Sequence, residues 1–234
     1  MPRPDRRWQT VALVVALAVA ALVFSRWPGL DLTVSALFYR LPAGFWLADL
    51  AWLETFRNLL WDLTIVTFVV AVVGVGLART RRPLLGVGLG DWSYIAALYL
   101  LGPVLLVNVI LKSHWGRARP ADVGQFGGAH LFTPPLQPAD QCASNCSFVS
   151  GEVAATVVMA ITMLVIAPAL ERWLPRWALR LWTGAAWLLP WLVALQRIAT
   201  GRHFLSDSLF SALFMLTLAL LLAPIRTFAG RPRR

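Results

Sequence analysis

Residues 148–170 read FVSGEVAATVVMAITMLVIAPAL, and this stretch decides the class of fold. Its one charged residue, Glu152, stands close to its start. An α-helix needs about 20 predominantly apolar residues to cross the hydrocarbon core of a bilayer. The stretch therefore predicts a membrane-spanning helix whose first turn carries polar groups.

Five further apolar runs of similar length accompany this one. The six predicted spans lie near residues 8–27, 59–78, 92–111, 148–170, 177–199 and 204–225. The composition of the 234-residue chain agrees, because 59% of it is hydrophobic and 14% is charged, against about 45–50% and about 25% in soluble domains. We predict an all-α integral membrane protein in which residues 1–234 form one six-helix bundle domain.

The distribution of basic residues gives the expected orientation in the membrane. Six spans place both termini on the same side, and 13 of the 21 Lys and Arg residues fall on that side. Basic residues near span ends are retained in the cytoplasm, so we expect both termini there and an uncleaved first span. The basic residues behind the formal net charge of +10 are spread over many short loops, which is typical of residues that set the orientation of a membrane protein. A nucleic-acid-binding face would gather them in one patch.

This orientation sends two long connections outward, residues 28–58 and 112–147. The first carries aromatic residues among scattered charges, which predicts amphipathic helices at the membrane interface. The second contains Cys142 and Cys146, the only two cysteines. In an oxidising periplasm these are expected to form a small disulfide ring. A metal site is the weaker alternative, because no His or Asp stands beside them in a zinc-like spacing.

Three segments on the outward side carry groups suited to phosphate chemistry, and the last along the chain is the clearest. His203 and Asp207 are four residues apart at the predicted start of a helix, so the carboxylate could hold one imidazole nitrogen and leave the other free to attack. Arg197 precedes the short turn, and its guanidinium fork suits a tetrahedral anion. The alternative interpretation is an interfacial His beside a solvated Asp.

The second segment is the start of the fourth span. Ser150 and Gly151 stand there, where unpaired backbone N–H groups and the helix dipole favour an anion. The alternative is plain N-capping by Ser147 or Ser150, with Glu152 offsetting the helix dipole in the first turn.

The remaining segment lies at the outer end of the third span. Lys112, the only lysine of the chain, and Arg119 add two positive charges where cytoplasmic retention cannot explain them. Asn108 stands one turn before Lys112 and is expected to support it. His114 and His130 also lie on this side. Together the three segments predict a phosphate site with a nucleophile.

A resemblance follows from these residues. In order and spacing, Lys112-x6-Arg119-Pro120, Ser150-Gly151 and Arg197-x5-His203-x3-Asp207 resemble the three-part signature of the type-2 phosphatidic acid phosphatase superfamily, whose membrane members are six-span lipid phosphatases. The resemblance implies a phosphohistidine intermediate on His203, with Asp207 orienting the imidazole. It also implies that the phosphoryl oxygens are bound by Lys112, Arg119, Arg197 and the backbone of Ser150-Gly151. The implied reaction needs neither a metal nor a cofactor, which agrees with the absence of an outward carboxylate cluster able to hold magnesium.

Two positions depart from that signature. Gln196 stands where the family usually has Ser, and Glu152 stands where the family has the His that acts as general acid. Glu152 could supply that acid or, when ionised, act as the base that activates water in the second step. His114 or His130 could then protonate the leaving oxygen.

The variant segment Ser147-Phe148-Val149-Ser150-Gly151-Glu152 is most similar to bacterial sequences described as lipid A phosphatase-like, as are His114-Trp115-Gly116-Arg117 and Phe126-Gly127-Gly128. We therefore expect a multi-pass protein of the bacterial inner membrane that dephosphorylates a lipid on the periplasmic face. Lipid A is the first candidate substrate, ahead of polyprenyl diphosphate and phosphatidylglycerol phosphate. The expected partners are this lipid phosphate and the membrane lipids, with no nucleic acid and no obligate protein partner. The alternatives are a lipid-to-lipid phosphotransferase with the same site, and a non-catalytic six-span transporter or binding protein for lipid phosphates.

Overall fold

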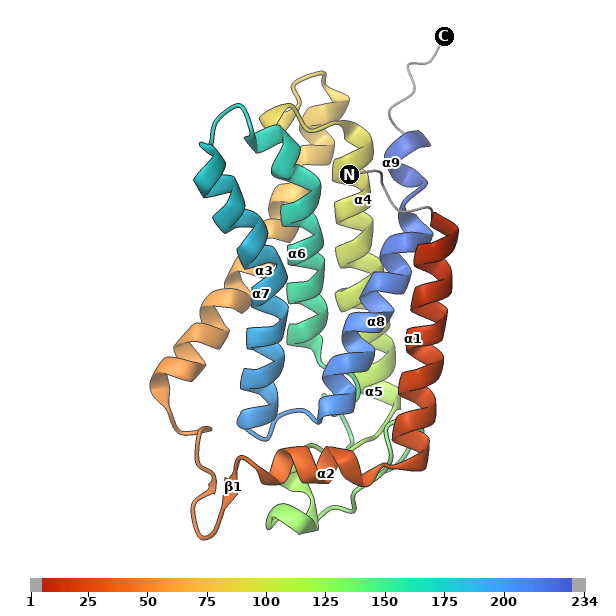
Figure 1. Ribbon diagram of the computed structural model, residues 1–234, viewed down its shortest axis with the longest axis vertical. Helices are drawn as coiled ribbons and strands as arrows, with labels where there is room; N and C mark the ends of the chain where they lie inside the picture. Colours follow the sequence, from red (N-terminus) through yellow and green to blue (C-terminus); the bar gives the residue numbers. More distant parts are fainter. Residues whose placement is uncertain (1–5, 229–234) are drawn as a thin grey trace.

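The computed structural model describes residues 6–228, which form a bundle of long helices running roughly side by side (Figure 1). Within these residues, six helices are long and apolar enough to cross a membrane. They are Arg6–Arg26, Ala51–Arg79, Leu89–His114, Gly151–Leu170, Arg176–Ala199 and Leu205–Thr227. The predicted all-α, six-span class of fold is confirmed.

The elements follow one another along the chain with these bounds: α1 (Arg6–Arg26), α2 (Gly29–Ala36), β1 (Tyr39–Arg40), β2 (Gly44–Phe45), α3 (Ala51–Arg79), η1 (Leu84–Gly86), α4 (Leu89–Tyr99), η2 (Leu100–Leu111), α5 (Lys112–His114), η3 (Pro120–Asp122), η4 (Gly124–Phe126), α6 (Gly151–Leu170), α7 (Arg176–Ala199), α8 (Leu205–Leu222) and α9 (Ile225–Phe228). The third span therefore changes from α-helical in α4 to π-helical in η2. Pro103 lies in the π-helical part, where its missing N–H removes one bond of a regular helix.

The connection over residues 28–58 differs from the predicted run of interfacial helices. Only its first part is a short separate helix, α2, which lies across the end of the bundle (Figure 1). The next part is an antiparallel hairpin of β1 and β2, turned at Pro42 and at Gly44, whose φ of +71° favours glycine. The last part belongs to α3, which begins at Ala51 rather than near residue 59. The apolar window missed this start because Glu54 and Arg57 interrupt it.

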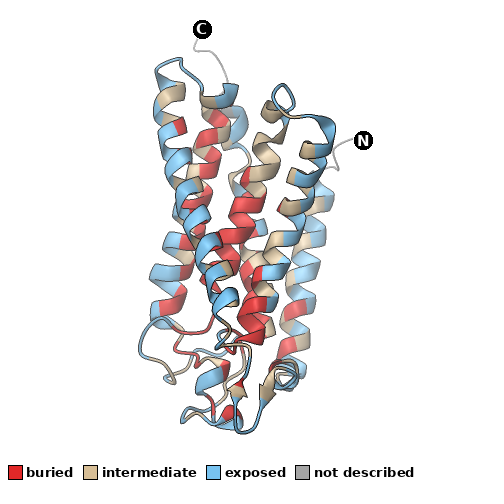
Figure 2. Cartoon of the chain, turned by 90° about the vertical axis from the view of Figure 1, so that its left-hand side faces the viewer, coloured by how far each residue is buried: buried red, intermediate tan, exposed pale blue. Residues whose placement is uncertain are grey.

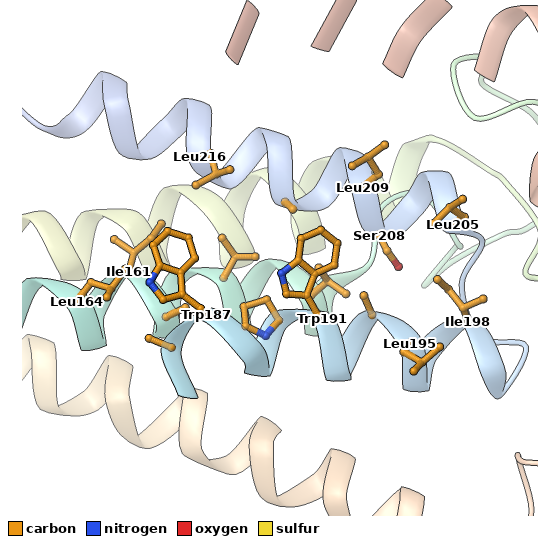
Figure 3. A pocket seen from close by; sticks show the side chains of 17 residues that line it. Ile161, Leu164, Trp187, Trp191, Leu195, Ile198, Leu205, Ser208, Leu209 and Leu216 are labelled. Atoms are coloured by element: carbon orange, nitrogen blue, oxygen red, sulfur yellow. The ribbon is translucent and has the colours of Figure 1, made fainter. Parts of the chain in front are cut away.

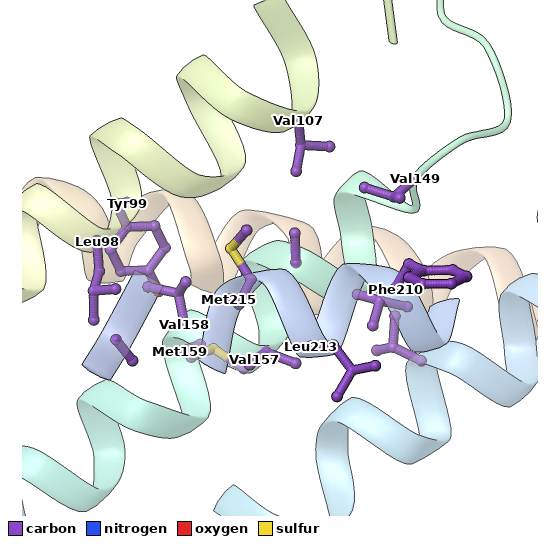
Figure 4. Close-up of a cluster of buried hydrophobic side chains, with 14 of the residues drawn as sticks. Leu98, Tyr99, Val107, Val149, Val157, Val158, Met159, Phe210, Leu213 and Met215 are labelled. Atoms are coloured by element: carbon purple, nitrogen blue, oxygen red, sulfur yellow. The ribbon is translucent and has the colours of Figure 1, made fainter. Parts of the chain in front are cut away.

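Helix α6 forms the centre of the bundle. Its first ten residues are all buried, and Figure 2 shows buried positions concentrated along the middle of the molecule. Small and β-branched side chains fill this segment, so neighbouring helices pack closely against it. Figure 4 shows part of the resulting core, with Val107, Val158, Phe210 and Met215 from three different spans.

The outer helices show the reverse pattern. Large apolar side chains of α1 and α7 are exposed, including Trp187 at 68% and Trp191 at 71%. Extensive exposed apolar surface marks contact with an apolar environment, which agrees with helices that face lipid.

One end of the bundle carries most of the irregular chain. Helix α2, the hairpin, the connection over residues 112–147 and the turn between α7 and α8 gather there, whereas α9 and the start of α1 lie at the opposite end (Figure 1). Cys142 and Cys146 form a disulfide within the longer connection. The three predicted site segments meet at this end.

Candidate active site

His203 lies in the turn between α7 and α8, and its side chain is fully buried. The turn depends on glycine at position 201. Gly201 has a φ of +66°, and a Cβ atom there would lie 2.5 Å from the ring of Phe45. Because Phe45 belongs to β2, the hairpin packs directly on the turn and helps to fix the imidazole in place.

The hydrogen bonding of His203 identifies its tautomer. Nδ1 lies 2.8 Å from the carbonyl oxygen of Ser147, which can only accept a hydrogen bond, so Nδ1 carries the proton. Nε2 has no hydrogen-bond partner among the described residues and lies 3.6 Å from Oε2 of Glu152. With Nδ1 held by the carbonyl, Nε2 is the ring nitrogen that could attack an electrophile when the imidazole is neutral.

Asp207 does not hold the imidazole directly, contrary to the expectation from its spacing. Its Oδ2 atom lies 3.8 Å from Nδ1 of His203, beyond hydrogen-bond distance. Oδ2 instead accepts from the backbone N–H of Phe204 at 2.9 Å and from the hydroxyl of Ser147 at 2.5 Å. The reason is that α8 begins at Leu205, so His203 precedes the helix while Asp207 caps its first turn. Asp207 therefore acts on His203 through Ser147.

Arg117 is a buried residue of this centre to which the sequence analysis assigned no role of its own. Its Nη1 donates to Asp207 Oδ1 at 2.6 Å, and its Nη2 donates to Asp31 Oδ2 at 2.8 Å. Asp31, on α2, also accepts from the backbone N–H and the hydroxyl of Ser206, at 2.9 and 2.5 Å. Burial raises the pKa of Asp31, and the Arg117 guanidinium opposes that shift. One fully buried cation thus joins two fully buried carboxylates from α2 and α8.

A polar cavity of about 360 Å³ reaches Glu152, whose Oε2 lies 3.6 Å from Nε2 of His203, while the fully buried His203 is not itself part of the lining. The cavity is lined by Glu54, Arg57, Trp61, Asn108, Lys112, Arg119, Asn145, Gly151, Glu152, Arg197 and Arg202. Five of these side chains are cationic and two are acidic, so the lining carries an excess of positive charge. Such a cavity suits a compact anion. Within residues 6–228, no group of three or more His, Cys, Asp or Glu side chains is placed to hold a metal ion.

The predicted phosphate-binding cations all line this cavity. Lys112 Nζ donates to Asn145 Oδ1 at 3.1 Å, and Arg119 Nη2 donates to the Asn145 carbonyl at 2.8 Å. Asn145, which the sequence analysis did not single out, therefore orders two of the three cations. The third, Arg197, reaches the cavity from the last turn of α7.

The N-terminus of α6 points at the same cavity. Gly151 lines it, and a Cβ atom at that position would lie 3.4 Å from Cε of Lys112. Ser150 is the N-cap residue, and its hydroxyl accepts from the Val153 N–H at 3.4 Å. The N-capping interpretation of Ser150 is therefore confirmed, and anion binding by the backbone of Ser150-Gly151 stays a prediction.

Glu152 also lies in the site, between the cations and the imidazole. Its Oε1 atom is 3.1 Å from Arg57 Nη2 and 3.4 Å from Arg197 Nη2. Its Oε2 atom is 3.6 Å from Nε2 of His203. Arg57 comes from α3 and lies in none of the three predicted segments.

The structure does not bring the two proposed accessory histidines to the cavity. His114 is exposed and bonds the Ile110 carbonyl through Nδ1 at 2.8 Å, while His130 is exposed on the connection over residues 112–147. Neither belongs to the cavity lining. Asn108 does line the cavity, but its amide donates to the Pro103 carbonyl at 2.8 Å, and Lys112 Nζ donates to Asn145.

A second cavity, of about 390 Å³, lies between α6, α7 and α8 (Figure 3). Its lining is apolar apart from Ser208, and the rings of Trp187 and Trp191 line it from α7. It offers no charge to an anion, so the polar cavity is the candidate active site.

The residues to which sequence reasoning assigned no role share one property. Asp31, Arg57, Arg117 and Asn145 bind partners far away in the chain; the Asp31–Arg117 and Arg57–Glu152 pairs are separated by 86 and 95 residues. The spacing of neighbouring residues in the sequence does not predict contacts between residues so far apart in the chain. The one usable signal is charge itself, since Arg57 and Asp31 stand in largely apolar surroundings.

Comparison with known proteins agrees with the site geometry. Residues 92–231 match the PAP2 superfamily. The chain is 34% identical over 206 residues to a lipid A 4'-phosphatase of Rhizobium leguminosarum, covering 79% of this chain and 82% of that protein. It is 27% identical over 219 residues to a lipid A 4'-phosphatase of Francisella tularensis subsp. novicida, covering 89% and 91%.

The fold also has a solved counterpart. The crystal structure of a transmembrane PAP2 type phosphatidylglycerolphosphate phosphatase from Bacillus subtilis matches 97% of this chain and 100% of that chain, with a TM-score of 0.59 and 21% identity. At this identity the likeness concerns the fold. With the matched residues covering more than half of the sequence, the chain belongs to the PAP2 superfamily.

Proposed function

We propose that this protein is a membrane lipid phosphatase that transfers the phosphoryl group of its substrate to Nε2 of His203 and then to water. The observation that carries the proposal is the buried imidazole of His203, whose Nδ1 is held by the Ser147 carbonyl. Its Nε2 lies 3.6 Å from Glu152, which lines a cavity together with Lys112, Arg119 and Arg197. The site supplies a nucleophile and an anion-binding wall in one place.

The first step is displacement at phosphorus. The Nε2 lone pair of His203 forms the N–P bond, and the P–O bond to the lipid breaks, with its electron pair leaving on the lipid oxygen. Arg197 and Arg119 offer guanidinium forks, and Lys112 offers a point charge, to the equatorial oxygens. Stabilising the charge on those oxygens is the main task of a phosphoryl-transfer site. In the second step water attacks phosphorus, the N–P bond breaks and inorganic phosphate leaves.

The proposed substrate is lipid A, ahead of polyprenyl diphosphate and phosphatidylglycerol phosphate. Two relatives that match most of the chain, at 34% and 27% identity, are named lipid A 4'-phosphatases. A lipid substrate also fits a cavity at the end of membrane-spanning helices, because its acyl chains can stay in the bilayer while the phosphate enters the site.

We further propose that the site faces the periplasm, with both termini in the cytoplasm of a bacterial inner membrane. The support is the excess of basic residues on the side of the termini, together with the Cys142–Cys146 disulfide at the site end. The proposed reaction is metal-independent. Its support is the cavity lining, where five cationic side chains supply the positive charge that magnesium supplies in other phosphoryl-transfer sites.

The test is phosphate release by the purified, detergent-solubilised protein from lipid A, polyprenyl diphosphate and phosphatidylglycerol phosphate, with EDTA present. We expect release from lipid A that survives EDTA and is lost in His203→Ala. Arg226→Gln serves as a control, since Arg226 pairs with Asp91 at the opposite end of the bundle. Loss of release in EDTA would overturn the metal-independent reaction. Transfer of phosphate to a second lipid would make the protein a phosphotransferase, and binding without turnover would make it a non-catalytic lipid-binding protein.

A further inference from the structure

The apolar cavity between α6, α7 and α8 takes no part in the proposed reaction. It has a volume of about 390 Å³, and the rings of Trp187 and Trp191 line it from α7 (Figure 3). Small side chains leave this space open, with Ala160 on α6, Ala194 on α7 and Ala212 on α8. Trp187 and Trp191 are also exposed, so the cavity lies at the surface of the bundle that faces lipid. We call this cavity the apolar groove.

The apolar groove runs along the helices from the site end of the bundle. Its lining lies within residues 153–164 of α6, 186–198 of α7 and 205–216 of α8, and each stretch starts at or beside the helix end at the site. At 1.5 Å per helical residue, these stretches are about 16–18 Å long. One leaflet makes up about half of a hydrocarbon core of about 30 Å. The groove therefore extends over about the depth of the leaflet on the side of the site.

One hydroxyl stands in this apolar lining, near its site end. Ser208 lies in the first turn of α8 and is only 4% exposed, and its Oγ atom has no hydrogen-bond partner among the described residues. Figure 3 shows the hydroxyl directed from α8 toward α7, near Ile198. Buried polar atoms normally have a partner. A ligand that carries an acceptor at this depth would supply one.

The surroundings decide what kind of molecule fills the groove. An empty space would forfeit the van der Waals contacts of its walls, and water is not held in an apolar space. In the hydrocarbon core, the molecule with an apolar chain of matching length is a membrane lipid. Its ester linkage places a carbonyl acceptor where the chain meets the headgroup, which matches the position of the single hydroxyl.

The groove is separate from the polar cavity. Within residues 6–228 the two linings share no residue. Glu152 and Arg197 line the polar cavity. Val153 and Ile198, the residues that follow them, line the groove. The turn at the end of α7 is covered by Phe45 of the hairpin, so a chain in the groove belongs to a lipid other than the one whose phosphate reaches the site.

We propose that the apolar groove binds one acyl chain of an ester-linked membrane phospholipid, with the hydroxyl of Ser208 donating to the ester carbonyl. The chain lies along α6 and packs against the rings of Trp187 and Trp191. Because Ile198 and Leu205 stand on either side of the turn between α7 and α8, the bound chain supports both helices that hold this turn. The inference does not depend on the proposed reaction.

The probe for the first test is phosphatidylcholine with a photoreactive diazirine in one acyl chain. Phosphatidylcholine is a phosphodiester, so it does not present the phosphomonoester of the proposed substrate. The full-length protein is reconstituted in phosphatidylcholine nanodiscs that contain the probe, irradiated and digested, and the labelled residues are identified by mass spectrometry. We expect adducts concentrated on the groove lining of α7 and α8. Adducts spread evenly over all lipid-exposed helix faces would overturn the proposal.

Two groove-filling variants place a ring in the space from different helices, Ala194→Trp from α7 and Ala212→Phe from α8. Each should lose the groove adducts. Leu188→Trp is the matched control, because Leu188 lies on α7, is 55% exposed and is outside the groove lining; it should keep them. Phosphatidylcholine should raise the thermal denaturation midpoint of the delipidated wild type and control, since a ligand of the folded protein stabilises it, but not that of the filled variants. Unchanged adducts in both filled variants would contradict the proposal.

The contact with Ser208 is tested with ether-linked phosphatidylcholine, which lacks the carbonyl. In the wild type the ester lipid should compete for the groove adducts better than the ether lipid, and Ser208→Ala should lose this preference. Equal competition by the two lipids in the wild type would overturn the contact. Loss of the adducts on addition of one equivalent of lipid A would assign the groove to the substrate's own chains and overturn the choice of phospholipid. Failure of phosphate release, by contrast, bears only on the proposed function.

Discussion

At the scale of single residues, the imidazole of His203 is held by a chain of hydrogen bonds rather than by one carboxylate. Asp207 accepts from the hydroxyl of Ser147, and the carbonyl of the same serine accepts from Nδ1 of His203. Asp207 in turn is bound by Arg117, which also binds Asp31. The orientation of the proposed nucleophile thus depends on residues that do not touch it.

Loss of Arg117 should cost much stability, because this residue pairs with two fully buried carboxylates. Removing one partner of a buried ion pair leaves an uncompensated charge and costs about 3–5 kcal/mol. In Arg117→Met, two buried carboxylates would lose their shared cation. We expect a lower thermal denaturation midpoint in detergent, with part of the loss recovered by adding Asp31→Asn.

Arg226→Gln is again the control for Arg117→Met, because the Arg226–Asp91 pair is partly exposed and should matter little. A midpoint for Arg117→Met within the range of that control would show that the buried carboxylates do not need the guanidinium.

At the scale of elements, the turn between α7 and α8 decides where His203 lies. The turn is closed by Gly201 and covered by Phe45 of the hairpin. Gly201→Ala would place a non-glycine residue at positive φ, at a cost of about 1–3 kcal/mol, and would bring its Cβ against the aromatic ring. We expect lower stability and lower turnover, measured by thermal denaturation and phosphate release. Adding Phe45→Ala should relieve the contact but leave the backbone strain.

Gly184→Ala is the matched control for this change. Gly184 lies within α7, and a Cβ atom there would meet nothing within 4 Å. This variant should keep its turnover and gain slightly in stability, because alanine favours a helix interior. Equal effects of the two substitutions would mean that the turn tolerates a side chain at position 201.

Among the elements, those with long apolar runs could be predicted and the irregular ones could not. Helix α6 is found directly from its sequence, because burial in lipid or protein requires an apolar stretch. Helix α3 begins earlier than its hydropathy indicates. Arg57 interrupts the apolar run, but it is accommodated in the helix because it pairs with Glu152 on α6. The hairpin at Tyr39–Phe45 replaces predicted helix because local turn residues outweigh the aromatic composition.

At the scale of the whole molecule, the polar site end and the opposite end must face different compartments. The account predicts that green fluorescent protein fused after Arg234 fluoresces in the cytoplasm, while alkaline phosphatase fused after Gln137 is active in the periplasm. The reverse pattern of reporter activity would invert the proposed topology.

The part of the site that could be predicted from the sequence consists of the residues that belong to the three motifs. Lys112, Arg119, Arg197 and His203 stand in recognisable spacings, and the structure brings them together. Arg57, Asp31 and Arg117 could not be assigned, because their partners come from helices that meet only in the folded bundle. Glu152 was recognised as a departure, but its orientation toward His203 depends on Arg57 and so is a property of the assembled molecule.

The decisive measurement for the proposed phosphohistidine reaction is the location of the phosphate during turnover. The wild-type protein is mixed with ³²P-labelled lipid A, quenched in alkali within milliseconds and digested, and the labelled peptide is sequenced. The account predicts label on the peptide containing His203, stable in alkali, lost in acid and absent from His203→Ala. Label on another residue, or rapid phosphate release with no labelled peptide at any time, would contradict it.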